Sequence, residues 1–148
     1  MTLSNKTIVL GVTGSIAVYK AVSLASALTQ EGARVDVIMT RSATEFVRPL
    51  SFQTVTQRPV VTEMFELDAE SRVQHVTLGQ AADLVIVAPA SAHTIARLAW
   101  GLADDVLSCT VLSTAAPVIV APAMESHMYA NAATQENLER LRTRGFTI

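Results

Sequence analysis

The sequence contains little charge and almost no cysteine. Asp, Glu, Lys and Arg together make up 16% of the 148 residues, whereas they make up roughly 25% of an average soluble protein. The single cysteine, Cys109, excludes an internal disulfide framework and is typical of a protein that works in a reducing compartment. We therefore expect a cytoplasmic protein.

Other absences exclude further classes of protein. The chain has no run of about 18 apolar residues, so we expect no membrane span, and its first residues lack the pattern of a secretory signal. The formal net charge is −2 and the Lys and Arg residues are scattered, which argues against nucleic acid as a partner. Because His, Cys, Asp and Glu do not occur at the spacings of a metal site, we predict no metal.

Hydrophobic residues are abundant and make up 50% of the chain. With so few charges, part of the apolar surface has to be covered by another subunit, so we expect a homo-oligomer. The chain is long enough to bury a core and shows no linker, repeat or low-complexity stretch. We therefore expect residues 1–148 to form a single domain.

Short apolar runs alternate with helical patterns along the chain. Continuous apolar runs, typical of strands that are covered on both faces, predict strands at Thr7–Leu10, Val35–Met39, Leu84–Ala88 and Val118–Ala121, with a further candidate at Val60–Met64. Helical patterns predict helices at Ile16–Gln30, from Ser42 onwards, at Thr94–Leu102 and at Asn131–Arg144. The alternation predicts an α/β fold, a doubly wound domain with a mostly parallel, Rossmann- or flavodoxin-like sheet.

Helix spacing and capping signals add detail. Apolar spacing in the first helix predicts a buried face that consists of Ile16, Val22, Ala25 and Leu28. Ser42, followed three residues later by Glu45, predicts a capping box at the start of the second helix. Adjacent residues on a helix point about 100° apart, so we expect Asp104 and Asp105 to form a helix cap or a subunit salt bridge.

A glycine turn, Gly11-Val12-Thr13-Gly14-Ser15, follows the first predicted strand and precedes the first helix. Backbone N–H groups at such a turn point at one spot, which suits a phosphate. The spacing is Gly-x-x-Gly and not the Gly-x-Gly-x-x-Gly of a dinucleotide site. A tight turn without a ligand is therefore the alternative interpretation.

The end of the second predicted strand argues against a nicotinamide dehydrogenase. A dinucleotide site needs an Asp or Glu there to hold a ribose diol. The strand ends instead in Met39-Thr40-Arg41-Ser42, and Asp36 lies too early in it. The hydroxyls of Thr40 and Ser42 suit a ribityl chain or a phosphate, or they cap the following helix.

Two later segments follow predicted strands at their carboxyl ends, where ligands bind in this fold. In Pro89–Thr94, small and hydroxyl residues let a flat ring approach the backbone, or they begin a helix; the other segment is Pro122–Tyr129. His75, His93 and His127 are able to exchange a proton near pH 7, or they are structural.

In their order and spacing, these segments match one family. The matching residues are Gly11–Ala17 with Tyr19-Lys20, Met39-Thr40 with Ala43 and Phe46, His75-Val76 with Leu78, Pro89–Ala96, Gly101–Asp105 and Pro122–Tyr129. Over essentially its whole length, the sequence resembles the homo-oligomeric flavin-containing cysteine decarboxylases. It looks most similar to the phosphopantothenoylcysteine decarboxylases of coenzyme A synthesis, including the N-terminal half of the bifunctional bacterial enzyme.

The resemblance implies a flavoprotein fold and a reaction. The reaction would be the FMN-dependent decarboxylation of 4′-phosphopantothenoylcysteine to 4′-phosphopantetheine in coenzyme A biosynthesis. In the family, flavin takes a hydride equivalent from the substrate's cysteine, the resulting thioaldehyde loses CO2, and the reduced flavin returns the electrons. The substrate would be a small, peptide-like amide that ends in a cysteine carboxylate. The assembly would be a trimer or a dodecamer built from trimers, with FMN at the subunit interface.

The resemblance also implies roles for single residues. Those along the FMN phosphate and ribityl chain would be Thr13, Gly14, Ser15, Ser91 and Thr94. The rest of the cofactor pocket would be lined by Thr40, Ser42 and Phe46 and, near the ring, by Ala92, His93 and Ala123. His75 would be the catalytic histidine, and Glu125 and Met128 would bind the substrate.

Substitutions at two motifs depart from the family's pattern. The family's substrate motif is Pro-x-Met-Asn-x-x-Met-Trp, but here Glu125 stands in the Asn position and Tyr129 in the Trp position. An ionised Glu cannot donate a hydrogen bond to a substrate carboxylate, so either Glu125 is protonated, or it meets a substrate N–H, or the substrate differs. His93 replaces the Asn of Ser-Ala-Asn-Thr and is still able to donate one hydrogen bond to the flavin.

The chain ends at Ile148, before the segment in which family decarboxylases carry a substrate-covering flap and a proton-donating cysteine; Cys109 is not that cysteine. We therefore expect either a truncated decarboxylase or a non-catalytic or regulatory FMN-binding subunit. A flavin prenyltransferase-like protein is a further alternative, although the segments around His75 and Pro122–Tyr129 argue against it.

Overall fold

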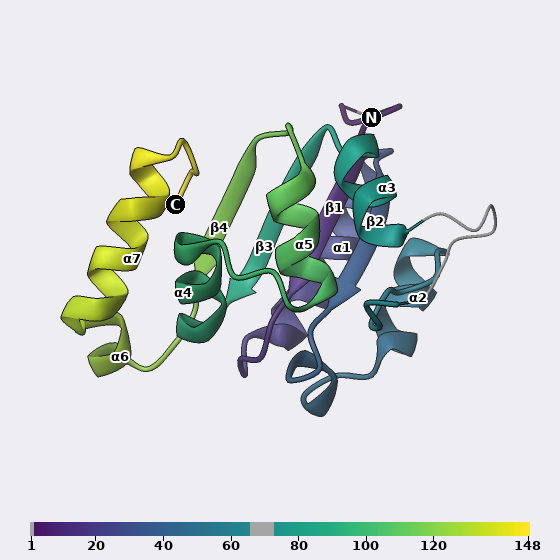
Figure 1. Cartoon of the computed structure of the whole chain (residues 1–148). Coiled ribbons are helices and arrows are strands. Elements are labelled where there is room, and N and C mark those ends of the chain that lie inside the picture. Colours follow the sequence, from purple (N-terminus) through teal and green to yellow (C-terminus); the bar gives the residue numbers. More distant parts are fainter. Residues whose placement is uncertain (1, 66–72) are drawn as a thin grey trace.

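Four parallel strands form the centre of the molecule. The computed structural model describes residues 2–65 and 73–148. The strands are β1 (Thr7–Val12), β2 (Arg34–Met39), β3 (Leu84–Ala90) and β4 (Val118–Pro122), in the order β2-β1-β3-β4 (Figure 1). The four predicted strands are confirmed, each one or two residues longer than predicted. The strand order reverses between β1 and β3, which makes the carboxyl end of this pair the expected place for a ligand.

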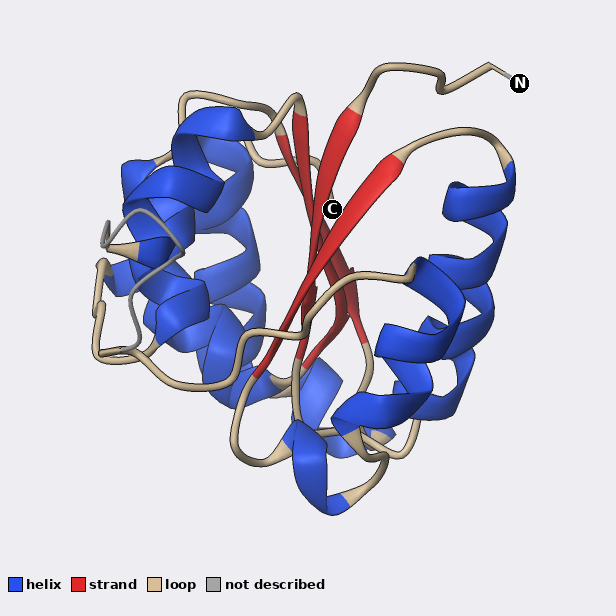
Figure 2. Cartoon of the chain, turned by 90° about the vertical axis from the view of Figure 1, so that its right-hand side faces the viewer, coloured by secondary structure: helices blue, strands red, loops and turns tan. Residues whose placement is uncertain are grey.

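Helices cover both faces of the sheet (Figure 2). On one face lie α1 (Val18–Gln30) and α2 (Pro49–Thr56). On the other lie α3 (Gln74–Ala81), α4 (Ala92–Trp100), α5 (Val106–Ser113) and α7 (Ala132–Thr143). The short helices η1 (Ala43–Glu45) and α6 (Ser126–Ala130) follow β2 and β4. This is the doubly wound α/β arrangement that the alternating pattern predicts.

The continuous apolar runs are explained by a core on each face of the sheet. In β1, Leu10 packs with Phe52 in the core beneath α1 and α2, whereas Val9 belongs to the core on the opposite face, together with Leu107 of α5. Successive side chains of a strand point to opposite faces. Gly11 also has a packing role, because a Cβ atom at this position would collide with the side chain of Leu107.

The first helix begins two residues later than predicted. Ile16 precedes α1 and is 76% exposed, so its predicted place in the buried face is wrong. The fully buried residues of α1 are Val18, Ala21 and Ala25, while Val22 and Leu28 are partly buried. Residues 13–17 are instead used for the turn at the carboxyl edge of the sheet.

The predicted capping box at Ser42 is also wrong. The Ser42 side chain makes no capping hydrogen bond, and η1 is a single 3-10 turn. Thr40 supplies the cap instead, because its Oγ1 accepts a hydrogen bond from the Ala43 backbone N–H at 3.3 Å. Val60–Met64 does not form a strand; only Val61 pairs with Ile38, in an isolated bridge.

The two later helices agree better with the prediction. Helix α4 begins at Ala92 rather than Thr94, because Ser91 Oγ caps it by accepting a hydrogen bond from the Thr94 N–H. Helix α7 has the predicted cap, in which the Asn131 side chain accepts a hydrogen bond from the Ala133 N–H at 2.9 Å. Helices α3, α5 and α6 were not predicted. In the described ranges, no helix has the length and apolar character needed to cross a bilayer.

Candidate functional site

The segments that follow the four strands meet at one edge of the sheet, the lower edge in Figure 1. Two adjoining cavities open there. The first, of about 420 Å³, is lined by Gly14, Thr40, Arg41, Ser42, Ser91, Ala92, His93, Thr94, Arg97, Asp104, Asp105 and Met128. The second, of about 570 Å³, is lined by Gly14, Ser15, Ile16, Ala17, Ser91, Ala92, Ala123, Met124, Glu125 and Met128. Both volumes suit a small-molecule ligand.

The structure brings most of the predicted site residues together. Those that line the cavities are Gly14, Ser15, Thr40, Ser42, Ser91, Ala92, His93, Thr94, Ala123, Glu125 and Met128. Three predicted residues, Thr13, Phe46 and His75, do not line either cavity. The residues that line the cavities come together because the carboxyl ends of parallel strands lie at the same edge of the sheet.

Thr13 is fully buried behind the cavity wall. Its hydroxyl donates a hydrogen bond to the Pro89 carbonyl at 2.6 Å and accepts one from the Ser91 backbone N–H at 2.9 Å. These bonds join the end of β1 to the end of β3. Thr13 therefore positions Ser91, and its own hydrogen is already donated to protein.

Gly14 lets two loops approach each other closely. A Cβ atom on Gly14 would lie only 2.5 Å from the Cβ of Ser42. The turn after β1 and the loop after β2 therefore touch at a point where any other residue would force them apart. The backbone of Gly14 is left open toward the cavity, as a phosphate or ribityl site requires.

Arg41 adds a positive charge to the hydroxyl-lined wall, and the sequence reasoning did not select it. It is exposed, lines the first cavity and forms no ion pair within residues 2–65 and 73–148. The Ser42 hydroxyl next to it is not used as a helix cap. An unpaired guanidinium beside a hydroxyl group is a favourable arrangement for a phosphate.

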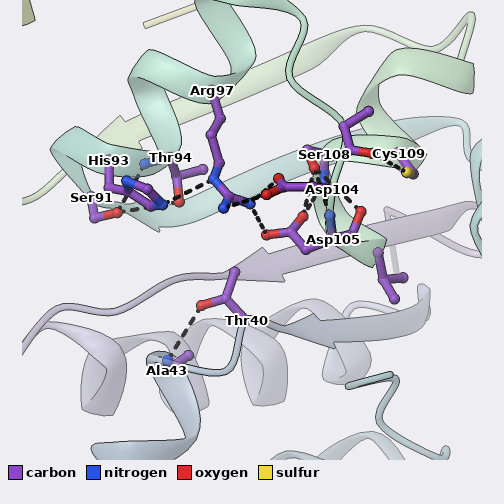
Figure 3. Close-up of polar contacts among 12 residues, drawn as sticks. Thr40, Ala43, Ser91, His93, Thr94, Arg97, Asp104, Asp105, Ser108 and Cys109 are labelled. Atoms are coloured by element: carbon purple, nitrogen blue, oxygen red, sulfur yellow. Dashed lines mark hydrogen bonds and ion pairs between the residues drawn. The ribbon is translucent and has the colours of Figure 1, made fainter. Parts of the chain in front are cut away.

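A second arginine, Arg97 in the last turn of α4, links His93 at the start of that helix to the N-cap of α5 (Figure 3). Its guanidinium forms ion pairs with Asp104 and with Asp105, and its Nε–H donates a hydrogen bond to His93 Nε2 at 2.9 Å. Asp105 also caps α5, because its Oδ1 accepts a hydrogen bond from the Ser108 N–H at 2.7 Å. The predicted capping role of Asp105 is confirmed. The position of Arg97 four residues after His93 was the available sequence signal for this cluster.

Glu125 forms one wall of the second cavity and caps α6. Its carboxylate accepts hydrogen bonds from the backbone N–H groups of His127 and Met128, from the Ser126 hydroxyl and from His127 Nδ1 at 2.8 Å. The hydrogen bond from the His127 N–H is the main reason why the pKa of Glu125 falls to about 2. The carboxylate of the ligand-free chain is therefore ionised at neutral pH, which argues against the protonated form considered from the sequence.

His75 lines neither of the two cavities. It is half-buried near the start of α3, and its carbonyl accepts a hydrogen bond from the Ser113 hydroxyl of α5 at 3.3 Å. Its ring Nδ1 is buried and has no hydrogen-bond partner in the described part of the chain. The structure therefore separates the predicted catalytic histidine from the cavities of its own chain.

Phe46 and Cys109 have no contact with the cavities. Phe46 follows η1 and is 50% exposed. Cys109 is buried in α5, where its thiol donates a hydrogen bond to the Ala103 carbonyl at 3.1 Å. Burial raises the pKa of this thiol, and the carboxylate of Asp105 raises it further. Cys109 is thus a structural residue, as expected.

Comparisons with known proteins agree with these observations. The model of the Flavoprotein family matches residues 1–148. The coenzyme A biosynthesis bifunctional protein CoaBC of Escherichia coli K12 is 50% identical over 148 residues, which are 100% of this chain and 36% of that protein. CoaBC of Vibrio cholerae is 47% identical over 144 residues, which are 97% of this chain and 36% of that protein. This chain thus spans little more than a third of the length of these relatives.

Solved structures show the same architecture. The FMN-dependent cysteine decarboxylase SpaF superposes with a TM-score of 0.92 at 31% identity, covering 98% of this chain and 83% of that one. A C175S mutant of PPC decarboxylase, complexed with pantothenoylaminoethenethiol, superposes with a TM-score of 0.83 at 30% identity, covering 96% of this chain and 80% of that one. The predicted family and fold are confirmed, and the chain belongs to the flavoprotein family.

Proposed function

We propose that this chain binds FMN and decarboxylates 4′-phosphopantothenoylcysteine to 4′-phosphopantetheine. The main observation behind the proposal is the pair of adjoining cavities at the switch point of the sheet, lined by the segments that carry the resemblance. The names of the relatives support it, since they are coenzyme A biosynthesis proteins and decarboxylases of cysteine-containing substrates.

The residues of the two cavities fit FMN. The first cavity offers the open backbone of Gly14, the hydroxyl of Ser42 and the guanidinium of Arg41, which suit a ribityl phosphate. In the second, small or apolar side chains surround a space for a flat ring, among them Ile16, Ala92, Ala123, Met124 and Met128. When bound, FMN supplies a two-electron acceptor that the protein's own side chains lack.

The ionised state of Glu125 favours one of the alternatives that the sequence leaves open, in which Glu125 meets a substrate N–H. An ionised carboxylate accepts hydrogen bonds and repels another carboxylate. Of the groups in a peptide-like substrate, an amide N–H is the one that it is able to bind. We therefore assign to Glu125, which lines the second cavity, the orientation of the substrate amide, away from the substrate's carboxylate.

A homo-oligomer explains the position of His75. This histidine does not line either cavity of its own chain, and the resemblance implies that FMN lies at a subunit interface. In a trimer, or in a dodecamer built from trimers, His75 reaches the cavity of a neighbouring subunit. Exposed large apolar side chains are available for such contacts, including Ile16, Tyr19, Trp100, Leu102 and Leu112. A free cysteine and a role in coenzyme A synthesis also favour the cytoplasm.

The release of CO2 from 4′-phosphopantothenoylcysteine tests the proposal. We expect the FMN-loaded chain to release CO2 and form 4′-phosphopantetheine, and we expect His75→Asn to bind FMN normally but release none. A yellow protein that releases no CO2 from this substrate would instead support the non-catalytic, FMN-binding alternative.

A further inference from the structure

His93 is a polar side chain of the first cavity, and only one of its ring nitrogens remains for a ligand. It lies in the first turn of α4, where it lines the cavity with Ser91 and Thr94. Its Nε2 lies 2.9 Å from Nε of Arg97, one helical turn later on the same helix. Within the described residues, Nδ1 has no hydrogen-bond partner.

The chemistry of the two side chains settles the direction of this hydrogen bond. A guanidinium has N–H donors and no acceptor, so Arg97 donates and Nε2 of His93 accepts. An imidazole accepts a hydrogen bond only at a nitrogen without a proton, and the neutral ring carries its single N–H on the other nitrogen. In this arrangement, His93 therefore carries its hydrogen on Nδ1.

Two carboxylates hold Arg97 in place for this role (Figure 3). Nη2 donates a hydrogen bond to Asp104 Oδ2 at 2.9 Å, and Nη1 donates one to Asp105 Oδ2 at 3.0 Å. Asp105 is itself fixed, because its other oxygen, Oδ1, accepts hydrogen bonds from the Ser108 N–H and hydroxyl, both at 2.7 Å. With both ends of the guanidinium held, its Nε–H has a defined direction toward His93.

We propose that Arg97 is a positioning residue that holds His93 as the Nδ1–H tautomer and so presents a neutral N–H donor to the ligand in the first cavity. The preferred ligand atom is an acceptor, such as an oxygen of the ribityl phosphate that the proposed function places in this cavity. The identity of that ligand as a flavin rests on the proposed function. The tautomer does not, because it follows from contacts within the chain.

Nitrogen spectroscopy of the ligand-free chain tests the tautomer directly. Long-range ¹H–¹⁵N correlation spectra of histidine-labelled protein distinguish the two tautomers, and the signals of His93 are assigned by their loss in His93→Asn. We expect Nδ1–H for His93 in the wild type and a shift toward Nε2–H in Arg97→Met. Nε2–H in the wild type would overturn the proposal, as would Nδ1–H that persists unchanged in Arg97→Met.

The chain offers two controls for this experiment. His127 donates from Nδ1 to the Glu125 carboxylate, so its tautomer should be Nδ1–H and should not respond to Arg97→Met. Arg142→Gln removes an arginine of α7 that pairs only weakly, at 3.5 Å, with Glu139, and it should leave the signals of His93 unchanged. If Arg97→Met does not fold, the wild-type spectrum alone still decides which nitrogen carries the hydrogen.

Titration with FMN tests whether the Nδ1–H group of His93 donates a hydrogen bond to the cofactor. We expect Arg97→Met and His93→Phe each to bind FMN about fivefold less tightly than the wild type, the effect of one lost hydrogen bond. His93→Asn retains an N–H donor and should bind more tightly than His93→Phe. Equal affinities of His93→Phe and the wild type would overturn the role of the donor. Failure of the wild type to bind FMN at all would overturn the proposed cofactor and leave the tautomer result standing.

Discussion

Arg41 and Glu125 place opposite charges in the two cavities. Arg41 has no ion pair in the described ranges and stands beside the hydroxyl of Ser42. Glu125 is ionised and already accepts hydrogen bonds from its own helix. Asp104 and Asp105, which also line the first cavity, are paired with Arg97. Arg41 therefore favours a ligand phosphate on its own side of the first cavity, and Glu125 favours amide N–H groups in the second.

Replacement of Arg41 by Gln should weaken the binding of FMN about tenfold, because one charge-assisted hydrogen bond to the phosphate is lost. Riboflavin, which lacks the phosphate, should bind the variant and the wild type equally. Flavin fluorescence titrations measure both affinities. Arg48→Gln, an exposed arginine outside both cavities, is the control and should bind FMN like the wild type. Equal losses for FMN and riboflavin would place the phosphate elsewhere.

The lowered pKa of Glu125 predicts how the stability of the fold depends on pH. Its pKa is about 2 in the folded chain and lies near the ordinary value of 4.5 when unfolded. Because the folded value is the lower one, the ionised carboxylate stabilises the fold above about pH 4.5, and this contribution is lost as the pH falls toward 2. The Glu125→Gln variant lacks this stabilising contribution at every pH. The difference in melting temperature between wild type and variant should therefore be larger at about pH 6 than at about pH 2.5. A difference that does not change with pH would contradict this assignment.

At neutral pH, the same Glu125→Gln variant tests the substrate role. We expect an unchanged FMN content and a raised KM for 4′-phosphopantothenoylcysteine, because the carboxylate that accepts the substrate's N–H has become a neutral amide. His127→Gln is the matched control, since it changes a partner of Glu125 without removing the carboxylate. A colourless Glu125→Gln protein would show that Glu125 holds the cofactor instead.

Among the elements, the strands were easier to predict than the helices. Strands that are buried on both faces appear as continuous apolar runs, so β1 to β4 could be read from the sequence. Helix α5 could not be found by apolar periodicity, because it is buried on nearly all sides, from Val106 to Val111. Its capping box, Asp105 with Ser108, was visible in the sequence and is the signal that could have located it.

The cap of α5 predicts a stability effect. Asp105→Ala removes both the cap and an ion-pair partner of Arg97, so the free energy of unfolding should fall by about 1–2 kcal/mol. Asp105→Asn keeps an effective capping side chain and should lose less. Urea denaturation measures both variants. Equal losses in the two variants would show that the charge of Asp105, and not its cap, stabilises this part of the molecule.

Contacts made by the loops explain why the capping box at Ser42 and the buried position of Ile16 were predicted wrongly. Ser42 and Glu45 have the spacing of a capping box, but Thr40 caps η1 and the Ser42 hydroxyl remains for a ligand. Ile16 fits the apolar face of a helix by spacing, but the chain needs residues 13–17 for the turn beside Gly14. Sequence periodicity contains no information about which turn a ligand-binding loop adopts.

At the scale of the whole molecule, the parallel sheet explains why most of the site could be predicted. Once a parallel sheet was inferred, the segments after the strands had to meet at one edge. Arg41 and Arg97 were not selected, because their roles depend on which charged groups the folded loops leave unpaired or bring together. The distance of His75 from the cavities could not be deduced from the order of motifs along one chain.

Mixed oligomers test the proposed sharing of the site. Gly14→Ala should distort the cavity wall, because its Cβ would lie 2.5 Å from the Cβ of Ser42 and force the two loops apart, and His75→Asn should remove the catalytic histidine. Each variant alone should be inactive. If His75 serves a neighbouring subunit, co-expression of the two variants should restore part of the decarboxylase activity, since some interfaces then combine an intact cavity with an intact histidine. A mixed oligomer without any activity would contradict a site that is shared between subunits.

The carboxyl edge of this sheet is the proposed flavin site, and an absorbance titration of the purified chain with FMN tests it. We expect the bands of bound, oxidised flavin in the wild type and their loss in Gly14→Ala, whose added Cβ would force the two loops apart. A wild-type chain that stays colourless and takes up no FMN would show that this edge is not a flavin site.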